Sequence, residues 1–244
     1  AAAAARRGRA ARGRASARRA RLVINALLVA HIAVLGYWLG SELVINATFR
    51  YVSYGASMPY AERERLMDHV MVVDQHVRYA LVLQATLGTM LSAAYGFLPG
   101  AQKLLWGAAL VGAAWLLFVE LVHRWRGQPV GVRLAALDRL SRYVLIVLLL
   151  ALGTGLLGAD WALPVWLRWK LGCFAGVVGC GVAIRLALLG WFRCWGELRA
   201  DPASETLNSA LVRHYWRATA VLIVLWLFIA AIVALSILKP VAGQ

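Results

Sequence analysis

Charged residues are scarce in this sequence. Asp, Glu, Lys and Arg make up 15% of the 244 residues, and only 11 residues are acidic. A soluble domain usually contains about 25% charged residues. The hydrophobic share is 62%, and the mean hydropathy is +0.69. These proportions exclude an ordinary soluble domain and predict an integral membrane protein in a lipid bilayer.

Lysine is almost absent, so the net charge of +15 is carried mainly by arginine. Eight arginines fall within residues 1–21, a segment without acidic, aromatic or β-branched residues. Such a segment cannot bury enough apolar surface to fold alone. We therefore predict a disordered Arg-rich tail over 1–21 and a single transmembrane helical domain over 22–240. The charge of the tail favours anionic lipid or an acidic protein surface as its partner, rather than nucleic acid.

Cysteine, methionine and familiar catalytic motifs are also sparse. The three cysteines form neither a disulfide framework nor a CxxC site, and we expect Cys173 and Cys180 to pack as small hydrophobic residues. Four methionines are too few for a soft-ligand copper relay. The sequence contains no P-loop, HExxH or nucleophile-elbow motif. It therefore carries none of these common catalytic signatures.

Long apolar runs are abundant. A helix needs about twenty apolar residues to cross the hydrocarbon core. Six runs qualify, at residues 22–49, 79–98, 104–122, 143–163, 166–192 and 217–238. In lipid a helix satisfies its own backbone hydrogen bonds. We therefore predict an all-α fold, namely a polytopic transmembrane helical bundle of about six spans.

The connections between these runs differ on the two faces of the membrane. The face that carries the amino-terminal tail, which we call side A, has the short turns "PGAQ" and "GADWALP". The opposite face, side B, has three longer segments. Apolar residues at three- and four-residue spacing predict short interfacial helices there. These segments are residues 60–78, 132–142 and 200–216.

The basic residues do not determine the membrane orientation. Side A holds twelve of them and side B thirteen, so the positive-inside rule favours neither orientation. The dense arginines directly before the first run favour a cytoplasmic amino terminus. We expect the protein to lie in a bacterial inner (plasma) membrane.

Ionisable residues in or beside the apolar runs are the candidates for function, because a charge inside the membrane is costly. His31 and Glu42 are eleven residues apart in the first run, which places them on one helix face about 16 Å apart. The stretch "DQHVR" supplies Asp74, His76 and Arg78 at the side B end of the second run. Most histidines thus converge with acids at side B, and His31 alone lies at mid-depth.

Several chemistries fit these residues. Histidines beside carboxylates ligate metals or haem, and His31, His76 and His123 are the candidate ligands. Histidines in such a cluster also shuttle protons, which is a second possibility. In the third possibility, the side B histidines lie in the headgroup layer and have no functional role. Because no other histidine shares the depth of His31, a mid-membrane bis-histidine haem is excluded. Lys170 either reaches the side A headgroups or turns inward to hold a carboxylate of a substrate or cofactor.

A family resemblance rests on short motifs. His31, Trp38, Gly40 and Glu42 form an "H…WxGxE" pattern that resembles the copper-resistance D-like membrane proteins. The later "DxHxR" and "WxxWKL" motifs extend the resemblance over residues 25–190. The histidine and the lysine are also similar to those of HemJ-type protoporphyrinogen oxidase, where they are tied to haem binding and activity. The resemblance implies such roles for His31 and Lys170.

Three classes of function remain open. The first is a redox or electron-transfer protein that binds haem b, or with less support copper, through a set of candidate residues. These are His31, Glu42, Asp74, His76, Arg78 and Lys170. The second class is a copper or proton transporter that uses the His/Glu/Asp cluster. The third is a non-catalytic subunit that binds other membrane-protein subunits of a larger complex.

Overall fold

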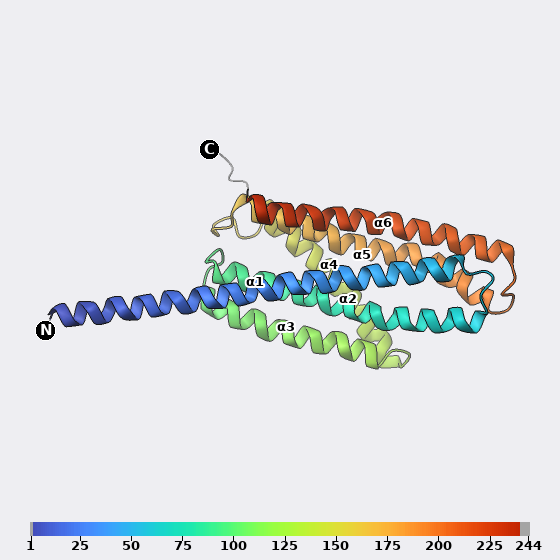
Figure 1. The fold of residues 1–244 in the computed structure, drawn as a ribbon, viewed down its shortest axis with the longest axis horizontal. Coiled ribbons are helices and arrows are strands. Elements are labelled where there is room, and N and C mark those ends of the chain that lie inside the picture. Colours follow the sequence, from blue (N-terminus) through green and yellow to red (C-terminus); the bar gives the residue numbers. More distant parts are fainter. Residues whose placement is uncertain (1, 240–244) are drawn as a thin grey trace.

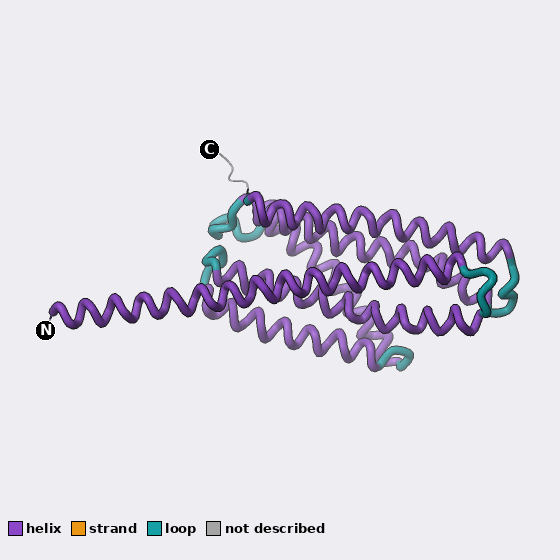
Figure 2. Tube along the Cα trace, in the orientation of Figure 1, coloured by secondary structure: helices purple, strands orange, loops and turns teal. Residues whose placement is uncertain are grey.

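The structure is a computed structural model that describes residues 2–239, with side chains described for residues 17–239. Within this range every element is an α-helix (Figure 1, Figure 2). The helices are α1 (Ala2–Tyr54), α2 (Tyr60–Ala94), α3 (Ala101–Arg124), α4 (Pro129–Thr154), α5 (Val165–Leu198) and α6 (Glu205–Leu238). The all-α prediction is confirmed. Most side chains of the predicted disordered tail lie outside the described residues, and its disorder stays a prediction.

The helices of the described chain form a closed ring. Each helix packs against its neighbours in the sequence, and α1 also packs against α6 (Figure 1). The backbones of α2 and α5 make no direct contact, so side chains fill the space between them. The buried residues of this central core are Trp38, Ala80, Val177, Cys180, Leu225 and Ile229. The presence of Cys180 among them confirms its expected role as a small hydrophobic residue.

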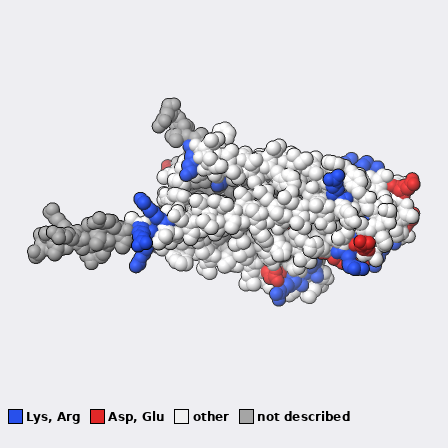
Figure 3. All heavy atoms as spheres, in the orientation of Figure 1, with Lys and Arg blue, Asp and Glu red and all other residues white. Residues whose placement is uncertain are grey.

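Four helices are long and apolar enough to cross a membrane. They are Ala17–Tyr54 of α1, together with α3, α5 and α6. Their length and composition identify the chain as an integral membrane protein. Figure 3 is consistent with this, because charged side chains gather at the two ends of the bundle and in one cluster on its lower edge, while a broad area of the visible face is nearly free of them. Two further helices, α2 and α4, complete the ring.

The segments predicted as short interfacial helices on side B do not form separate helices. They are instead continuous with α2, α4 and α6. No glycine or proline separates them from the apolar runs that follow, so nothing ends the helix there. The last of these helices begins at Glu205 rather than beside Asp201. Ser204 is its N-cap, because its hydroxyl accepts the backbone N–H of Leu207 at 3.5 Å.

The helix over the predicted run 143–163 ends earlier than the apolar pattern indicated. α4 stops at Thr154 because Gly155 adopts the left-handed conformation, with φ of +83°. Glycine occupies this helix-ending position without steric strain. Residues 155–164 then form the turn to α5, and Arg168 Nη2 donates to the Gly158 carbonyl in that turn at 3.3 Å. The apolar run therefore comprises a helix end and a loop rather than one complete span.

On side B, three long helices extend beyond the two short helices of the ring. α2, α5 and α6 have 34 or 35 residues, whereas α3 has 24 and α4 has 26. The excess of about ten residues corresponds to about 15 Å of helix. We call this extension, together with the end of α1, the side B tip (Figure 1). Its buried core is Phe49, Val52, Met67, Val70, Trp191, Leu198, Leu211 and Tyr215.

Arg63 joins the helices of the side B tip from its interior. Its side chain is almost fully buried, with 1% of the residue exposed. Nε donates to the Val52 carbonyl at 3.1 Å, and Nη1 donates to Asn208 Oδ1 at 2.9 Å. The guanidinium carbon lies 5.4 Å from the centre of the Trp195 ring. Burial lowers the pKa of Arg63, and the two oxygens and the aromatic face stabilise its charge.

Replacing Arg63 with alanine should destabilise the protein by about 3 kcal/mol, because Val52 and Asn208 then lose a charged donor inside the tip. The midpoint of thermal unfolding in detergent measures this loss. Arg65→Ala is the matched control, since Arg65 is exposed on the same helix. Equal unfolding midpoints for the two variants would contradict the structural role of Arg63.

Candidate functional site

Charged side chains meet inside the ring near the side B ends of α3 and α4. On α2, Asp74 and Arg78 are one helical turn apart. Arg78 donates to Asp74 Oδ2 from Nη2 at 2.9 Å and from Nε at 3.0 Å. The Arg78 side chain is only 11% exposed. The two predicted residues therefore form a pair, and its cation lies within the protein.

A second pair on α4 contacts the first. Arg142 Nη2 donates to Asp138 Oδ2 at 3.0 Å, and Asp138 is 4% exposed. The same Asp138 oxygen lies 3.9 Å from Arg78 Nη1. One carboxylate thus interacts with cations from two helices. This arrangement fits the rule that a buried charge is tolerated only when it is paired.

Arg185 of α5 completes the group from the other side of the ring. Its Nη2 lies 4.0 Å from Asp74 Oδ2. Because the α2 and α5 backbones are not in contact, this interaction crosses the ring through side chains alone. We call Asp74, Arg78, Asp138, Arg142 and Arg185 the ionic network. It contains three arginines and two aspartates, and Arg142 Nε is buried without a hydrogen-bond partner among the described residues.

Glu42 lies beside the ionic network on α1. Its Oε1 accepts a hydrogen bond from Trp38 Nε1 at 3.3 Å. Glu42 is also close enough to Asp74 for the two carboxylates to interact electrostatically. No hydrogen bond or ion pair joins Glu42 to the ionic network among the described residues, so its grouping with the side B residues stays a prediction.

His76 faces a different direction from Asp74. The Tyr37 hydroxyl and His76 Nδ1 are hydrogen-bonded between α1 and α2, and the His76 ring also packs edge-on against Tyr79. In turn, the Tyr79 hydroxyl donates to Glu120 of α3. These contacts link α1, α2 and α3 through a chain of polar side chains. The structure therefore does not join His76 to the ionic network.

The candidate metal ligands lie apart. His123 is on α3, where its Nδ1 is buried without a hydrogen-bond partner among the described residues. His76 contacts tyrosines, and His31 lies farther toward side A. In the described part of the chain, no three His, Cys, Asp or Glu side chains are placed to hold a metal ion together. A metal site made by His31, His76 and His123 jointly is not present in this geometry.

A second polar centre lies nearer side A. Lys170 Nζ of α5 donates to Ser236 Oγ of α6 at 2.9 Å, and both side chains are half-buried near the side A ends of their helices. It is close enough to His31 of α1 for electrostatic interaction. His31 Nδ1 is buried without a partner among the described residues, and the His31 carbonyl accepts Gln84 Nε2 at 3.0 Å. We call these two residues the His31–Lys170 pair.

Sequence reasoning missed three members of the ionic network. Asp138 and Arg142 were assigned to an interfacial helix, although their spacing of four residues already indicates an ion pair on one helix face. Arg185 stands alone in the apolar stretch "GVAIRLALLG". A single arginine inside a predicted span is a functional signal by itself, and it would have identified this residue.

Comparison of the chain with protein-family models, with curated proteins and with solved structures finds no match. The geometry of the two polar centres is therefore the basis for assigning a function.

Replacing Asp138 with asparagine should destabilise the protein by about 3 kcal/mol, because two arginines then lose their shared counter-charge. The measurement is thermal unfolding in detergent. Asp68→Asn, at an exposed position on α2, should have almost no effect. The double variant Asp138→Asn/Arg142→Gln should lose less than the sum of its single changes, and strict additivity would show that the two residues do not interact.

Proposed function

We propose that this integral membrane protein binds haem b at the His31–Lys170 pair and acts in a redox or electron-transfer setting. The observation that carries the proposal is the bonding of the half-buried Lys170 side chain. Its ammonium group has a serine hydroxyl as hydrogen-bond partner and forms no ion pair within the described residues. A buried cation without a carboxylate is costly, and a bound carboxylate would compensate it.

The surroundings of His31 fit a haem ligand. Its Nδ1 has no hydrogen-bond partner among the described residues, so this buried atom has no structural role of its own. Gly88 of α2 faces the imidazole, because a Cβ atom added there would lie 3.6 Å from His31 Cε1. Because glycine has no side chain, the α2 backbone packs close to the His31 imidazole at this position. In the HemJ-type resemblance the same histidine and lysine are tied to haem.

Haem suits this geometry better than a bare metal ion. A metal held by side chains alone needs several ligands, and the described residues offer no group of three. Haem supplies four nitrogens itself and needs one protein imidazole. His31, the one histidine at its depth, meets that requirement. The same reasoning gives copper transport less support.

Each residue of the centre has a distinct task in this proposal. The His31 imidazole would hold the haem iron, and Lys170 would neutralise a propionate carboxylate. Gln84 holds the α1 backbone against α2 through the His31 carbonyl at 3.0 Å, which fixes the position of the ligand. When bound, haem supplies one-electron redox chemistry that the side chains lack. Ser236 orients Lys170 through their hydrogen bond.

We place the protein in a bacterial inner membrane with a cytoplasmic amino terminus. The support is the arginine density in the tail directly before the first span. Side A, and with it the His31–Lys170 pair, then lies nearer the cytoplasm.

Protein purified in detergent, or reconstituted with haemin, should show a Soret absorption band. His31→Ala should abolish this band, and Lys170→Met should weaken haem binding about tenfold through loss of one charge-assisted contact. The control is His69→Ala, because His69 is exposed on α2 and should not affect the spectrum.

A Soret band that is unchanged in His31→Ala, or absent after reconstitution, would overturn the haem proposal. Copper bound at about one equivalent per chain would then favour transport. Migration in a larger native complex without any cofactor would favour the accessory-subunit function.

A further inference from the structure

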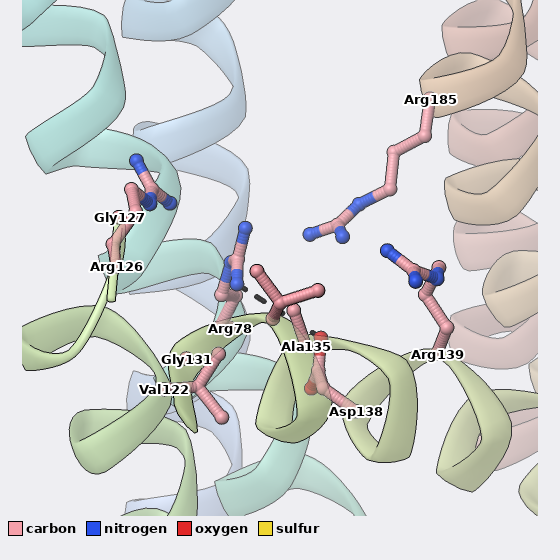
Figure 4. A pocket seen from close by; sticks show the side chains of 10 residues that line it. Arg78, Val122, Arg126, Gly127, Gly131, Ala135, Asp138, Arg139 and Arg185 are labelled. Carbon is pink, nitrogen blue, oxygen red and sulfur yellow. Dashed lines mark ion pairs between the residues drawn. The ribbon is translucent and has the colours of Figure 1, made fainter. Parts of the chain in front are cut away.

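A cavity lined by arginines opens beside the ionic network. Its volume is about 220 Å³, and it lies between α2, α4, α5 and the turn after α3. Figure 4 shows Arg78 of α2 and Arg185 of α5 extending their guanidinium groups toward the same space above α4. Arg126 and Arg139, both exposed, add two more guanidinium groups at its margin.

Most of these arginines have unused donors. The guanidinium groups of Arg126, Arg139 and Arg185 make no hydrogen bond to the described part of the chain, and that of Arg185 only approaches Asp74 at 4.0 Å. Asp138 is the single carboxylate in the lining, and Arg142 and Arg78 already share it. Each guanidinium carries five N–H donors. The cavity therefore presents far more donors than the chain has acceptors for them.

The charge of this region is unbalanced as well. Its arginines are the four of the cavity and Arg142, which makes five. The neighbouring carboxylates are those of Glu42, Asp74 and Asp138, which makes three. An excess of positive charge in a partly desolvated cleft attracts an anion. Asp138, which two arginines already share, is the one acidic side chain of the described residues that lines the cavity.

We propose that this cavity binds a phosphate group. Guanidinium forks match the oxygens of phosphate in charge and geometry, and donors from three sides suit a tetrahedral anion. The cavity is smaller than the roughly 300 Å³ at which small-molecule pockets begin, so it fits one anionic group rather than a whole cofactor. The phosphate can belong to the headgroup of an anionic lipid or to a soluble phosphate that enters from side B.

The phosphate site is separate from the proposed haem site. Along α2, Arg78 is ten residues from Gly88, which corresponds to about 15 Å of helix. Neither Lys170 nor His31 lines the arginine cavity. Failure of haem binding would therefore leave the phosphate proposal intact. Failure of phosphate binding would likewise leave the haem proposal intact.

The test uses the full chain in nanodiscs of zwitterionic phosphatidylcholine. Inorganic phosphate is titrated by calorimetry into the wild-type protein and into the variants Arg185→Gln and Arg139→Gln. In a second arm, the phosphatidylglycerol retained through detergent purification is quantified for each protein. Arg139→Gln guards against misfolding, because Arg139 is exposed and forms no ion pair in the described chain. Arg133→Gln is the control, since Arg133 is exposed on α4 outside the cavity.

Binding should weaken about tenfold in each cavity variant, the effect of losing one charge-assisted hydrogen bond, and should stay unchanged in Arg133→Gln. Loss of phosphate affinity in the first arm identifies a soluble source. Loss of retained phosphatidylglycerol alone identifies a lipid headgroup. The proposal is overturned if the wild type binds neither probe, or if Arg133→Gln weakens binding as much as the cavity variants do.

Discussion

Charge inside an apolar bundle has to be matched by charge from another helix, and this requirement organises the side B half of the ring. Asp138 is 4% exposed and interacts with arginines of α2 and α4. Asp74 pairs with Arg78 on its own helix and reaches Arg185 across the ring. Because the α2 and α5 backbones do not touch, side chains determine how these helices face each other. Losing one partner leaves an uncompensated charge, which costs far more than losing an exposed ion pair.

The two polar centres differ in whether their cations have carboxylate partners. Arg78 and Arg142 each hold an aspartate at about the shortest distance an ion pair allows, so they serve the fold. Lys170 holds only a hydroxyl, and Arg185 has only a distant contact with Asp74. A cation without a close partner adds little to stability, yet it is ready to bind an anionic guest. The presence or absence of a close carboxylate partner therefore distinguishes cations that stabilise the fold from cations that are candidates for binding an anion.

The sequence predicted the helices well and the charged site only in part. Long apolar runs specify membrane helices almost by length alone. The stretch "DQHVR" singled out Asp74 and Arg78 as candidates, but it did so together with His76, which contacts tyrosines instead. The pattern over 132–142 revealed a polar helix face but not its surroundings. A helix that faces the lipid headgroups and a helix that faces the polar interior of a ring show the same alternation of polar and apolar residues. For this reason Asp138 was assigned to the membrane surface, and Arg185 was overlooked because its partner lies on another helix.

The excess of arginines over carboxylates lies at the level where the arginine cavity opens, and the lengths of the helices explain why. α3 and α4 are about ten residues shorter than their neighbours, so the ring loses two of its six walls near the ionic network. Beyond this step four helices continue as the side B tip, with its own apolar core and the buried Arg63. Toward side A the central core closes the ring. Between these two cores, the wall opens where arginines exceed carboxylates, and the arginine cavity occupies that level.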